Sequence, residues 1–291
     1  MKSSMTKYVV ITPVRDESKY IAATIEGMLA QTVKPVEWII VDDGSSDDTA
    51  EVVRQYAGSH SWIRLVVRGN RGYRYSGAGV VEAIYKGFDC LQIDDWDFLV
   101  KLDGDLGLPS DYFEKALQHF QQNARLGIGG GSLYHMIDGQ PEIEKCPRFH
   151  VRGATKIYRK DCWRAIGGLQ VAPGWDIVDE VKANMLGWQT ETFEDVRAIH
   201  HRVTGTAESR WKNLIKNGKA YYFAGYHPLF MAARCVYRLT DAPYVIGSVA
   251  MALGFVSGYC KRTPRIDDPA LIHFLRHQQM QRLLGQETIW K

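Results

Sequence analysis

Two aspartates separated by one glycine follow an apolar segment near the middle of the chain. Asp103 and Asp105 come directly after residues 97–102, which have the apolar character of a strand, and Gly104 lets the backbone turn so that both carboxylates face one site. Divalent cations such as Mg²⁺ and Mn²⁺ prefer oxygen ligands and are commonly held by one or two carboxylates, with phosphate oxygens completing the coordination. The pattern therefore indicates a site for Mn²⁺ or Mg²⁺ against a diphosphate, and a solvated acidic turn is the alternative.

Strands and helices that would position these aspartates alternate along the first hundred residues. Residues 8–12, 36–41 and 63–67 are short apolar runs that end in charged or turn residues, as buried strands do. Helices are expected between them, because apolar side chains recur at helical spacing in residues 21–29 and 80–91. Strands that alternate with helices predict the α/β fold class, with a mostly parallel central sheet.

The second of these strands ends in the acidic, turn-rich segment 42–49. In open α/β sheets, ligands bind at the carboxyl ends of the strands. We therefore expect Asp43 to line a binding site at that edge. Asp47 and Asp48 instead suit the N-terminal end of the helix that follows.

Three segments together resemble the inverting family-2 glycosyltransferases of the GT-A fold. Residues 13–17, 41–49 and 103–105 read PVRDE, VDDGSSDDT and DGD, in the order and spacing of the family's motifs. The resemblance covers roughly residues 7–205. It implies a GT-A, Rossmann-like α/β/α sandwich that transfers a sugar from a nucleoside-diphosphate sugar to a hydroxyl acceptor.

The resemblance also implies roles for individual residues. Asp105 would be the principal metal ligand, with Asp103 near the ribose or the metal. The other donor-binding residues that it implies are Asp43 at the base and Pro13, Arg15 and Glu17 along the nucleotide pocket. The family has an arginine near residues 76–80 that is missing here, and Arg71 or Arg74 is the candidate to replace its charge.

The chemistry also needs a group that accepts a proton. Inverting transfer is a single displacement at the anomeric carbon, so the acceptor hydroxyl must pass its proton to a carboxylate. Counting back from Gly187 and Trp188, Asp176 falls on the acid that serves as base in the family, although Trp175 stands where the family has glutamate. Asp179 lies one helical turn later and is the alternative base. A structural role is also open for Asp176, as the cap of a helix.

A late strand over residues 196–202 ends in two imidazoles, where many relatives bring a histidine to the metal or the diphosphate. Successive strand residues face opposite sides, so only one of the two imidazoles is expected to reach the site. His201 is favoured over His200 as the metal ligand, and Arg202 is a candidate phosphate contact.

Composition limits the classes of function. The chain has 291 residues and is 45% hydrophobic, which is enough for a full core. Its net charge of +3 is too small to indicate a nucleic-acid partner. The five cysteines lack C-x-x-C spacing, which indicates free thiols in a reducing compartment and no zinc site. The first seven residues lack the apolar core of a signal peptide, so a cytoplasmic location is expected.

The C-terminal quarter differs from the rest. We place a glycosyltransferase domain at residues 1–215 and a helical region at 216–291, in which residues 244–259 carry no charge. As a helix, that segment reaches about 24 Å, short of the ~30 Å hydrocarbon layer. It fits a helical hairpin lying in the interface at the inner face of the cell membrane. An ordinary buried helix or an oligomer contact is the alternative.

We expect a metal-dependent inverting glycosyltransferase whose acceptor is a lipid-linked or polysaccharide precursor. Two other functions match part of the pattern. A sugar-nucleotide pyrophosphorylase would need a glycine-rich basic loop after the first strand, and residues 12–17 are not one. A catalytically silent nucleotide-sugar-binding module would not need both Asp105 and Asp176.

Overall fold

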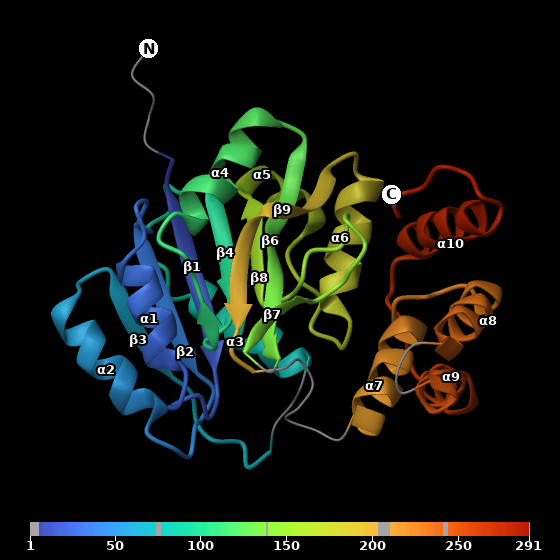
Figure 1. Cartoon of the computed structure of the whole chain (residues 1–291), viewed down its shortest axis with the longest axis horizontal. Helices are drawn as coiled ribbons and strands as arrows, with labels where there is room; N and C mark the ends of the chain where they lie inside the picture. Colours follow the sequence, from blue (N-terminus) through green and yellow to red (C-terminus); the bar gives the residue numbers. More distant parts are fainter. Residues whose placement is uncertain (1–5, 74–76, 138, 203–209, 241–243, 291) are drawn as a thin grey trace.

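Nine strands form one sheet in the computed structural model, which describes residues 6–73, 77–137, 139–202, 210–240 and 244–290. The order across the sheet is β3-β2-β1-β4-β8-β6-β9-β5, and β7 pairs with β6 (Figure 1). The strands are β1 (Tyr8–Val14), β2 (Glu37–Asp42), β3 (Ile63–Val67), β4 (Phe98–Leu102), β5 (Leu106–Gly107), β6 (Leu126–Ile137), β7 (Gln140–Ile143), β8 (Thr155–Arg159) and β9 (Gln189–His200). The strands that precede the sequence motifs, β1, β2 and β4, are therefore neighbours in the sheet.

Most strands run in one direction. β1 pairs in parallel with β2 and β4, and β2 pairs in parallel with β3. β8 is antiparallel to both β4 and β6, so β6 again follows the direction of β4, and β9 is parallel to β6. This confirms the mostly parallel sheet that the sequence predicts. The segments that follow β1, β2 and β4 consequently leave the sheet at one edge.

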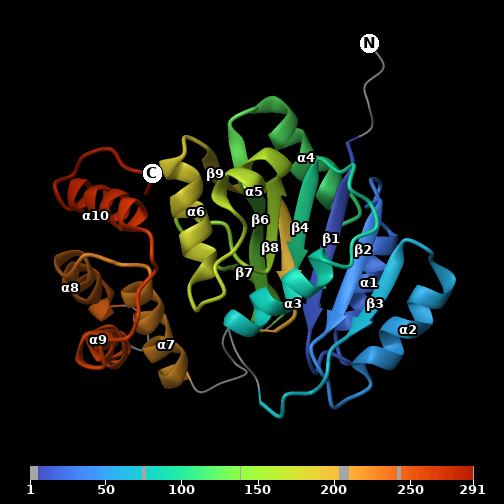
Figure 2. The same cartoon turned by 180° about the vertical axis from the view of Figure 1, so that it is seen from behind.

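Helices cover both faces of the sheet (Figures 1 and 2). Against one face lie α1 (Ile21–Leu29), α2 (Thr49–Ser59) and α4 (Tyr112–Gln122), and against the other lie α3 (Ala78–Phe88), α5 (Lys160–Ile166) and α6 (Trp175–Met185). Each face has its own apolar core. Ile25 of α1 packs with Tyr8 on the first face, and Ile84 of α3 packs with Ile11 on the second. The α/β/α sandwich expected from the sequence is therefore confirmed.

A helical region follows the sandwich and packs beside α6 (Figure 1). In the described residues it contains α7 (Arg210–Phe223), α8 (Pro228–Tyr237), the 3₁₀ turn η1 (Arg238–Thr240), α9 (Tyr244–Cys260) and α10 (Pro269–Leu283). Its apolar core includes Phe255 of α9 and Leu271 of α10, and Val181 of α6 joins it. The predicted boundary at residue 215 falls inside α7. None of the described helices combines the length and apolar character that a bilayer crossing requires.

Two glycines allow α7 and α9 to cross at close range. A Cβ on Gly218 of α7 would collide with the carbonyl oxygen of Met251, and a Cβ on Gly254 of α9 would collide with that of Ile215. Any larger residue would force the backbones apart, so glycine is required at both positions. The two helices form one closely packed pair.

Candidate active site

The two aspartates of the central motif lie in the short turn between β4 and β5. Gly104 between them packs tightly, because a Cβ there would lie 2.6 Å from Cγ1 of Val14. Asp105 is buried, whereas Asp103 is partly exposed and its Oδ1 lies 2.5 Å from Nζ of Lys101. Ligand atoms of Asp103, Asp105 and His200 all lie within 4.8 Å of one another. The turn therefore brings two carboxylates and one imidazole to a single point.

The histidine in this cluster is His200, the last residue of β9. It pairs with Leu106 across the sheet, and its Nε2 lies 3.3 Å from Oδ1 of Asp105. His201 is exposed, and its ring stacks parallel to the ring of Tyr20, with 6.1 Å between the centroids. The structure thus places His200 beside the aspartates, in contrast to the preference for His201. The sequence identifies the alternation of the strand but not which of its two faces meets the aspartates.

The donor atoms of the cluster fit a hard divalent cation. Two carboxylates and one imidazole suit Mn²⁺ or Mg²⁺, and they lack the thiolates that softer metals prefer. Burial raises the pKa of Asp103, and the negative charge of Asp105 adds to this effect, while the ammonium of Lys101 opposes it. Burial by itself lowers the pKa of His200, but its hydrogen bond to Asp105 and the charge of that residue raise the pKa overall. A bound cation would relieve the repulsion between the two acids.

Asp43 follows β2 and sits in a cluster of arginines. Its Oδ1 lies 2.6 Å from Arg68 and 2.6 Å from Arg71, and both guanidiniums also contact Glu82 of α3. Arg15 donates a hydrogen bond of 3.1 Å to the carbonyl oxygen of Asp43. The structure therefore brings together Asp43, Arg15 and Arg71 as the sequence suggests. Arg68 is an addition, which its place directly after β3 could have indicated, and Arg74 lies outside the described residues.

Glu17 connects this nucleotide-side cluster to the aspartates. Its backbone N–H donates to the hydroxyl of Thr49 at 2.8 Å, and its carboxylate forms an ion pair with Arg202. Nε of Arg202 lies 3.5 Å from Oδ2 of Asp105. Pro13 lies in the register of β1 opposite Val41 of β2 and so belongs to the sheet edge behind these groups. Arg202, a candidate phosphate contact, thus lies between two of the predicted site residues.

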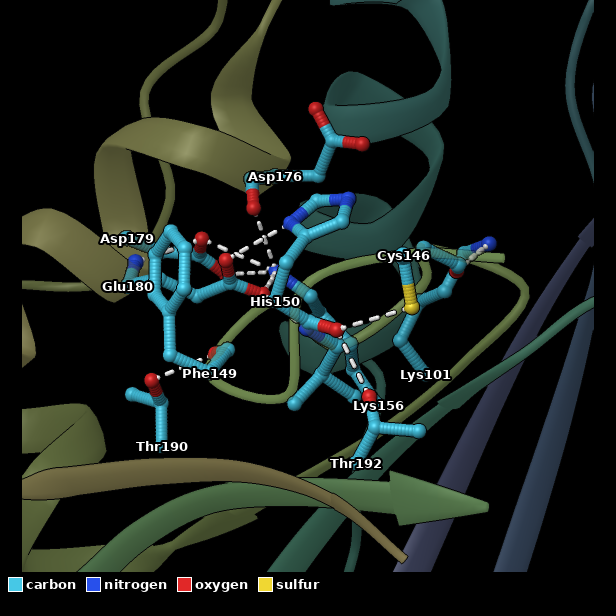
Figure 3. Close-up of polar contacts among 12 residues, drawn as sticks. Lys101, Cys146, Phe149, His150, Lys156, Asp176, Asp179, Glu180, Thr190 and Thr192 are labelled. Atoms are coloured by element: carbon cyan, nitrogen blue, oxygen red, sulfur yellow. Dashed lines mark hydrogen bonds and ion pairs between the residues drawn. The ribbon is translucent and has the colours of Figure 1, made fainter. Parts of the chain in front are cut away.

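The two candidate bases on α6 lie in different environments. Asp176 is partly exposed and lines a cavity of about 280 Å³. In Figure 3 its carboxylate points away from Asp179, and only its backbone carbonyl takes part in the buried network, accepting a hydrogen bond of 2.7 Å from Lys156. Asp179 is 2% exposed, and its oxygens accept hydrogen bonds from Lys156 at 3.0 Å and from the hydroxyl of Tyr158 at 2.6 Å. Of the two acids, Asp176 lines a cavity, whereas Asp179 is enclosed in the protein.

Lys156 of β8 is the centre of the buried network and is fully enclosed. It contacts Asp179 and also Oε1 of Glu180 at 2.8 Å. Burial by itself lowers the pKa of Lys156, but the two carboxylates raise it overall. Burial raises the pKa of Asp179 to about 6, and the charge of Lys156 counteracts part of this rise. The network fixes the first turn of α6 and so positions Asp176, a role for which the sequence around Lys156 carries no signal.

Lys101 and Gly153 lie between Asp176 and the aspartate cluster. Lys101 donates to the carbonyl oxygen of Gly153 and contacts Asp103. A Cβ on Gly153 would lie 3.7 Å from Oδ2 of Asp176, so the loop that carries Gly153 passes directly beside this acid. Trp175 is 6% exposed and belongs to the apolar core, where its ring also faces Lys101 at 5.8 Å. Trp175 thus fills part of the apolar core and also contributes to the lining of the cavity at Asp176.

Comparison with known sequences gives one family match. The model described as "Glycosyl transferase family 2" matches residues 9–165, which include Asp43, Asp103 and Asp105. Chondroitin synthase of Escherichia coli is 33% identical over 90 residues, which cover 31% of this chain and 13% of that protein. The uncharacterized glycosyltransferase EpsJ of Bacillus subtilis (strain 168) is 28% identical over 128 residues, which cover 43% of this chain and 33% of that protein. The matches therefore span a third or less of these relatives.

Two solved structures share the fold over most of the chain. S. aureus TarS 1-349 in complex with UDP-GlcNAc has a TM-score of 0.55 at 16% identity, covering 95% of this chain and 81% of TarS. The mannosyltransferase PcManGT from Pyrobaculum calidifontis, in complex with GDP-Man and Mn²⁺, has a TM-score of 0.56 at 15% identity, covering 98% of this chain and 77% of PcManGT. At these identities the structural similarity confirms the GT-A fold. The nucleotide sugars and the Mn²⁺ are ligands of those two proteins.

Proposed function

Because this chain belongs to glycosyl transferase family 2, we propose that it transfers a sugar from a nucleoside-diphosphate sugar to a hydroxyl group of a glycan or lipid-linked acceptor. The observation that carries the proposal is the meeting of Asp103, Asp105 and His200 at the edge of the sheet where Asp43 also lies. The nucleotide sugars bound by TarS and PcManGT, and the Mn²⁺ of PcManGT, support it. We further propose inversion at the anomeric carbon and a requirement for Mn²⁺ or Mg²⁺.

Three groups of residues have separate roles in the proposed reaction. Asp103, Asp105 and His200 would hold the cation, which when bound neutralises charge that develops on the diphosphate leaving group. Asp43 and its arginines bind the nucleoside side of the donor. Asp176 accepts the proton of the acceptor hydroxyl. The oxygen of that hydroxyl attacks the anomeric carbon, and the bond from this carbon to the diphosphate breaks.

A thermal-shift panel of nucleoside diphosphates with and without Mn²⁺ tests donor binding. We expect one nucleoside diphosphate to raise the melting temperature only when Mn²⁺ is present, because a ligand that binds the folded state stabilises it by about 2.7 kcal/mol at 100 times its Kd. The matching nucleoside, which has no diphosphate, serves as the control. Nucleotide-sugar hydrolysis in the same buffer separates an enzyme from a silent binding module. Absence of any Mn²⁺-dependent shift across the panel would contradict the proposal.

We also propose that an apolar surface on α8 and α9 rests on the inner leaflet of the cell membrane. Val245 and Ile246 at the start of α9 are 57% and 63% exposed, and Tyr237 at the end of α8 is 81% exposed. The rest of this lipid-facing surface is formed by Leu229, Val236, Tyr244, Val249, Leu253 and Val256. Lys261 and Arg262 follow α9 and are exposed, where they suit anionic headgroups. A lipid-linked acceptor would explain an apolar surface of this kind.

Co-sedimentation with vesicles of phosphatidylglycerol and phosphatidylcholine tests this surface. We expect the protein to sediment with these vesicles and the double variant V245D/I246D to remain in the supernatant, because two charges would have to enter the interface. Leu186, 47% exposed at the end of α6 and outside this surface, provides the control variant Leu186→Asp. If size-exclusion chromatography shows a dimer that V245D/I246D converts to a monomer, the surface is a subunit interface and the membrane proposal is wrong.

A further inference from the structure

Two cavities at the junction of the sandwich and the C-terminal helices adjoin each other. The first, of about 280 Å³, holds Asp176 and is closed by Lys216, Asn217 and Tyr221 of α7. The second, of about 200 Å³, shares Asn217 and Tyr221 with it, as well as His150, Arg152 and Ile177. Because they share five lining residues, the two cavities lie side by side, the first at the proposed base and the second toward α8, and we take them together as one binding region. We call it the acceptor channel.

The far end of the acceptor channel is strongly basic. The basic side chains that line the second cavity are Lys145, His150, Arg152, Arg234 and Arg238. Among the described residues, no carboxylate lines it. Two acids outside the lining contact it: Glu144 forms an ion pair of 3.1 Å with Arg152, and Glu180 lies 2.8 Å from His150. Phe149, Tyr226 and Trp290 complete the lining with aromatic surface. The cavity thus combines fixed cations with aromatic rings.

Two guanidiniums of this lining have a buried nitrogen atom that lacks a hydrogen-bond partner among the described residues. Nε of Arg152 and Nε of Arg234 are both enclosed and lack a hydrogen-bond partner. Arg234 donates to the hydroxyl of Tyr221 at 3.2 Å and lies over its ring at 5.1 Å. The titratable groups that act on its charge are Tyr221, Tyr226 and Cys235, with no described carboxylate among them. A buried N–H group without a hydrogen-bond partner costs stability unless a ligand supplies an acceptor. A planar guanidinium is suited to carboxylate or phosphate oxygens.

We propose that the far end of the acceptor channel binds an anionic group of the acceptor, a carboxylate or a phosphate, through Arg152 and Arg234. The aromatic side chains beside them provide faces against which a sugar ring stacks. This inference rests on the proposed function, because it takes the channel at Asp176 as the place where the acceptor lies. It narrows the acceptor to an acidic glycan or a sugar phosphate, and it excludes a neutral glycan.

Titration with three small sugars tests the charge preference. Glucuronate carries a carboxylate, glucose 6-phosphate carries a phosphate, and glucose is the neutral control; binding is followed by intrinsic tryptophan fluorescence, because Trp175 and Trp290 line the channel. We expect at least one of the two anionic sugars to bind at least tenfold more tightly than glucose, and the stronger of the two identifies the source of the anion. Equal binding of all three sugars would overturn the proposal.

Variants assign the preference to the channel. Arg234→Gln and Arg152→Gln are each expected to remove most of the tenfold preference, while Arg234→Lys retains part of it. Arg265→Gln is the matched control, since Nε of Arg265 is also enclosed without a partner but its guanidinium lies over the rings of Tyr222 and Tyr259, outside the channel. Melting curves verify that each variant folds. An equal loss in Arg265→Gln, or none in both channel variants, contradicts the assignment.

The Mn²⁺-dependent nucleotide shift is measured on the same samples. A protein that binds the nucleoside diphosphate but shows no anion preference disproves only the inference. A protein that shows the anion preference but binds no nucleoside diphosphate disproves the proposed donor chemistry.

Discussion

Asp176→Asn is expected to lower the rate of sugar transfer by about 10²- to 10⁴-fold, the contribution of a positioned general base. An amide cannot accept the proton of the acceptor hydroxyl at neutral pH, but it has nearly the same shape as the carboxylate. The side chain lines the acceptor channel and only the backbone carbonyl of Asp176 accepts a hydrogen bond from Lys156, so the protein should still fold. The measurement is initial-rate transfer with saturating donor, beside the Mn²⁺-dependent thermal shift with nucleoside diphosphate. The shift should be unchanged.

Asp179→Asn is the matched control for this variant, because it makes the same chemical change one helical turn away. Asp179 is enclosed with Lys156 and Tyr158, so its replacement should reduce the free energy of unfolding by about 1 to 3 kcal/mol. Transfer by the folded fraction should fall much less than in Asp176→Asn, because Asp179 acts only by holding α6 in place. A large loss of transfer in folded Asp179→Asn, with little loss in Asp176→Asn, would mean that Asp179 is the base and Asp176 is not.

Asp105→Asn is expected to abolish the Mn²⁺-dependent part of the nucleoside-diphosphate shift and to lower transfer by more than about 100-fold. Loss of a residue that only supports a metal ligand typically costs 10- to 100-fold, so loss of a central carboxylate ligand should cost more. Asp105 is 6% exposed and is bounded by His200 at 3.3 Å and Arg202 at 3.5 Å. The measurement is the thermal shift across a Mn²⁺ titration, followed by transfer at each concentration.

An exposed acid provides the control for Asp105. Asp48 lies at the N-terminal end of α2, outside the cluster, and Asp48→Asn should leave the Mn²⁺ titration unchanged. A full Mn²⁺-dependent shift in Asp105→Asn would mean that the cation binds elsewhere. The second cluster that could hold a metal, His135, Glu144 and His200, would then be the site to test.

Sequence patterns predict the strands, the helices and the order of the motifs well, because these depend on local spacing. The aspartates after β2 and β4 meet at one edge once the strands are taken as parallel, and the structure brings Asp43, Arg15 and Arg71 into contact there. The proximity of Asp103 and Asp105 could be predicted from the glycine between them, which allows a tight turn. Each of these inferences uses residues that are close in sequence or at the ends of neighbouring strands.

Contacts between distant elements could not be predicted in this way. Lys156 and Asp179 lie 23 positions apart, and nothing in the sequence pairs a lysine of β8 with an acid of α6. The choice between His200 and His201 depends on the twist of β9 and its pairing with β5. The walls of the acceptor channel come from α7 and α8, whose positions are set by packing against α6 and α9.

The glycine crossing of α7 and α9 links two surfaces that would otherwise be independent. One side of α7 lines the acceptor channel with Asn217 and Tyr221, while Gly218 packs the helix against α9, which carries much of the exposed apolar surface proposed to face lipid. If α9 rests on a bilayer as proposed, the closely packed pair of α7 and α9 would fix the height of the reacting hydroxyl above the headgroups. An acceptor whose linker places its terminal sugar at that height would then be a substrate. An acceptor with a shorter or longer linker would not bring its terminal sugar to Asp176.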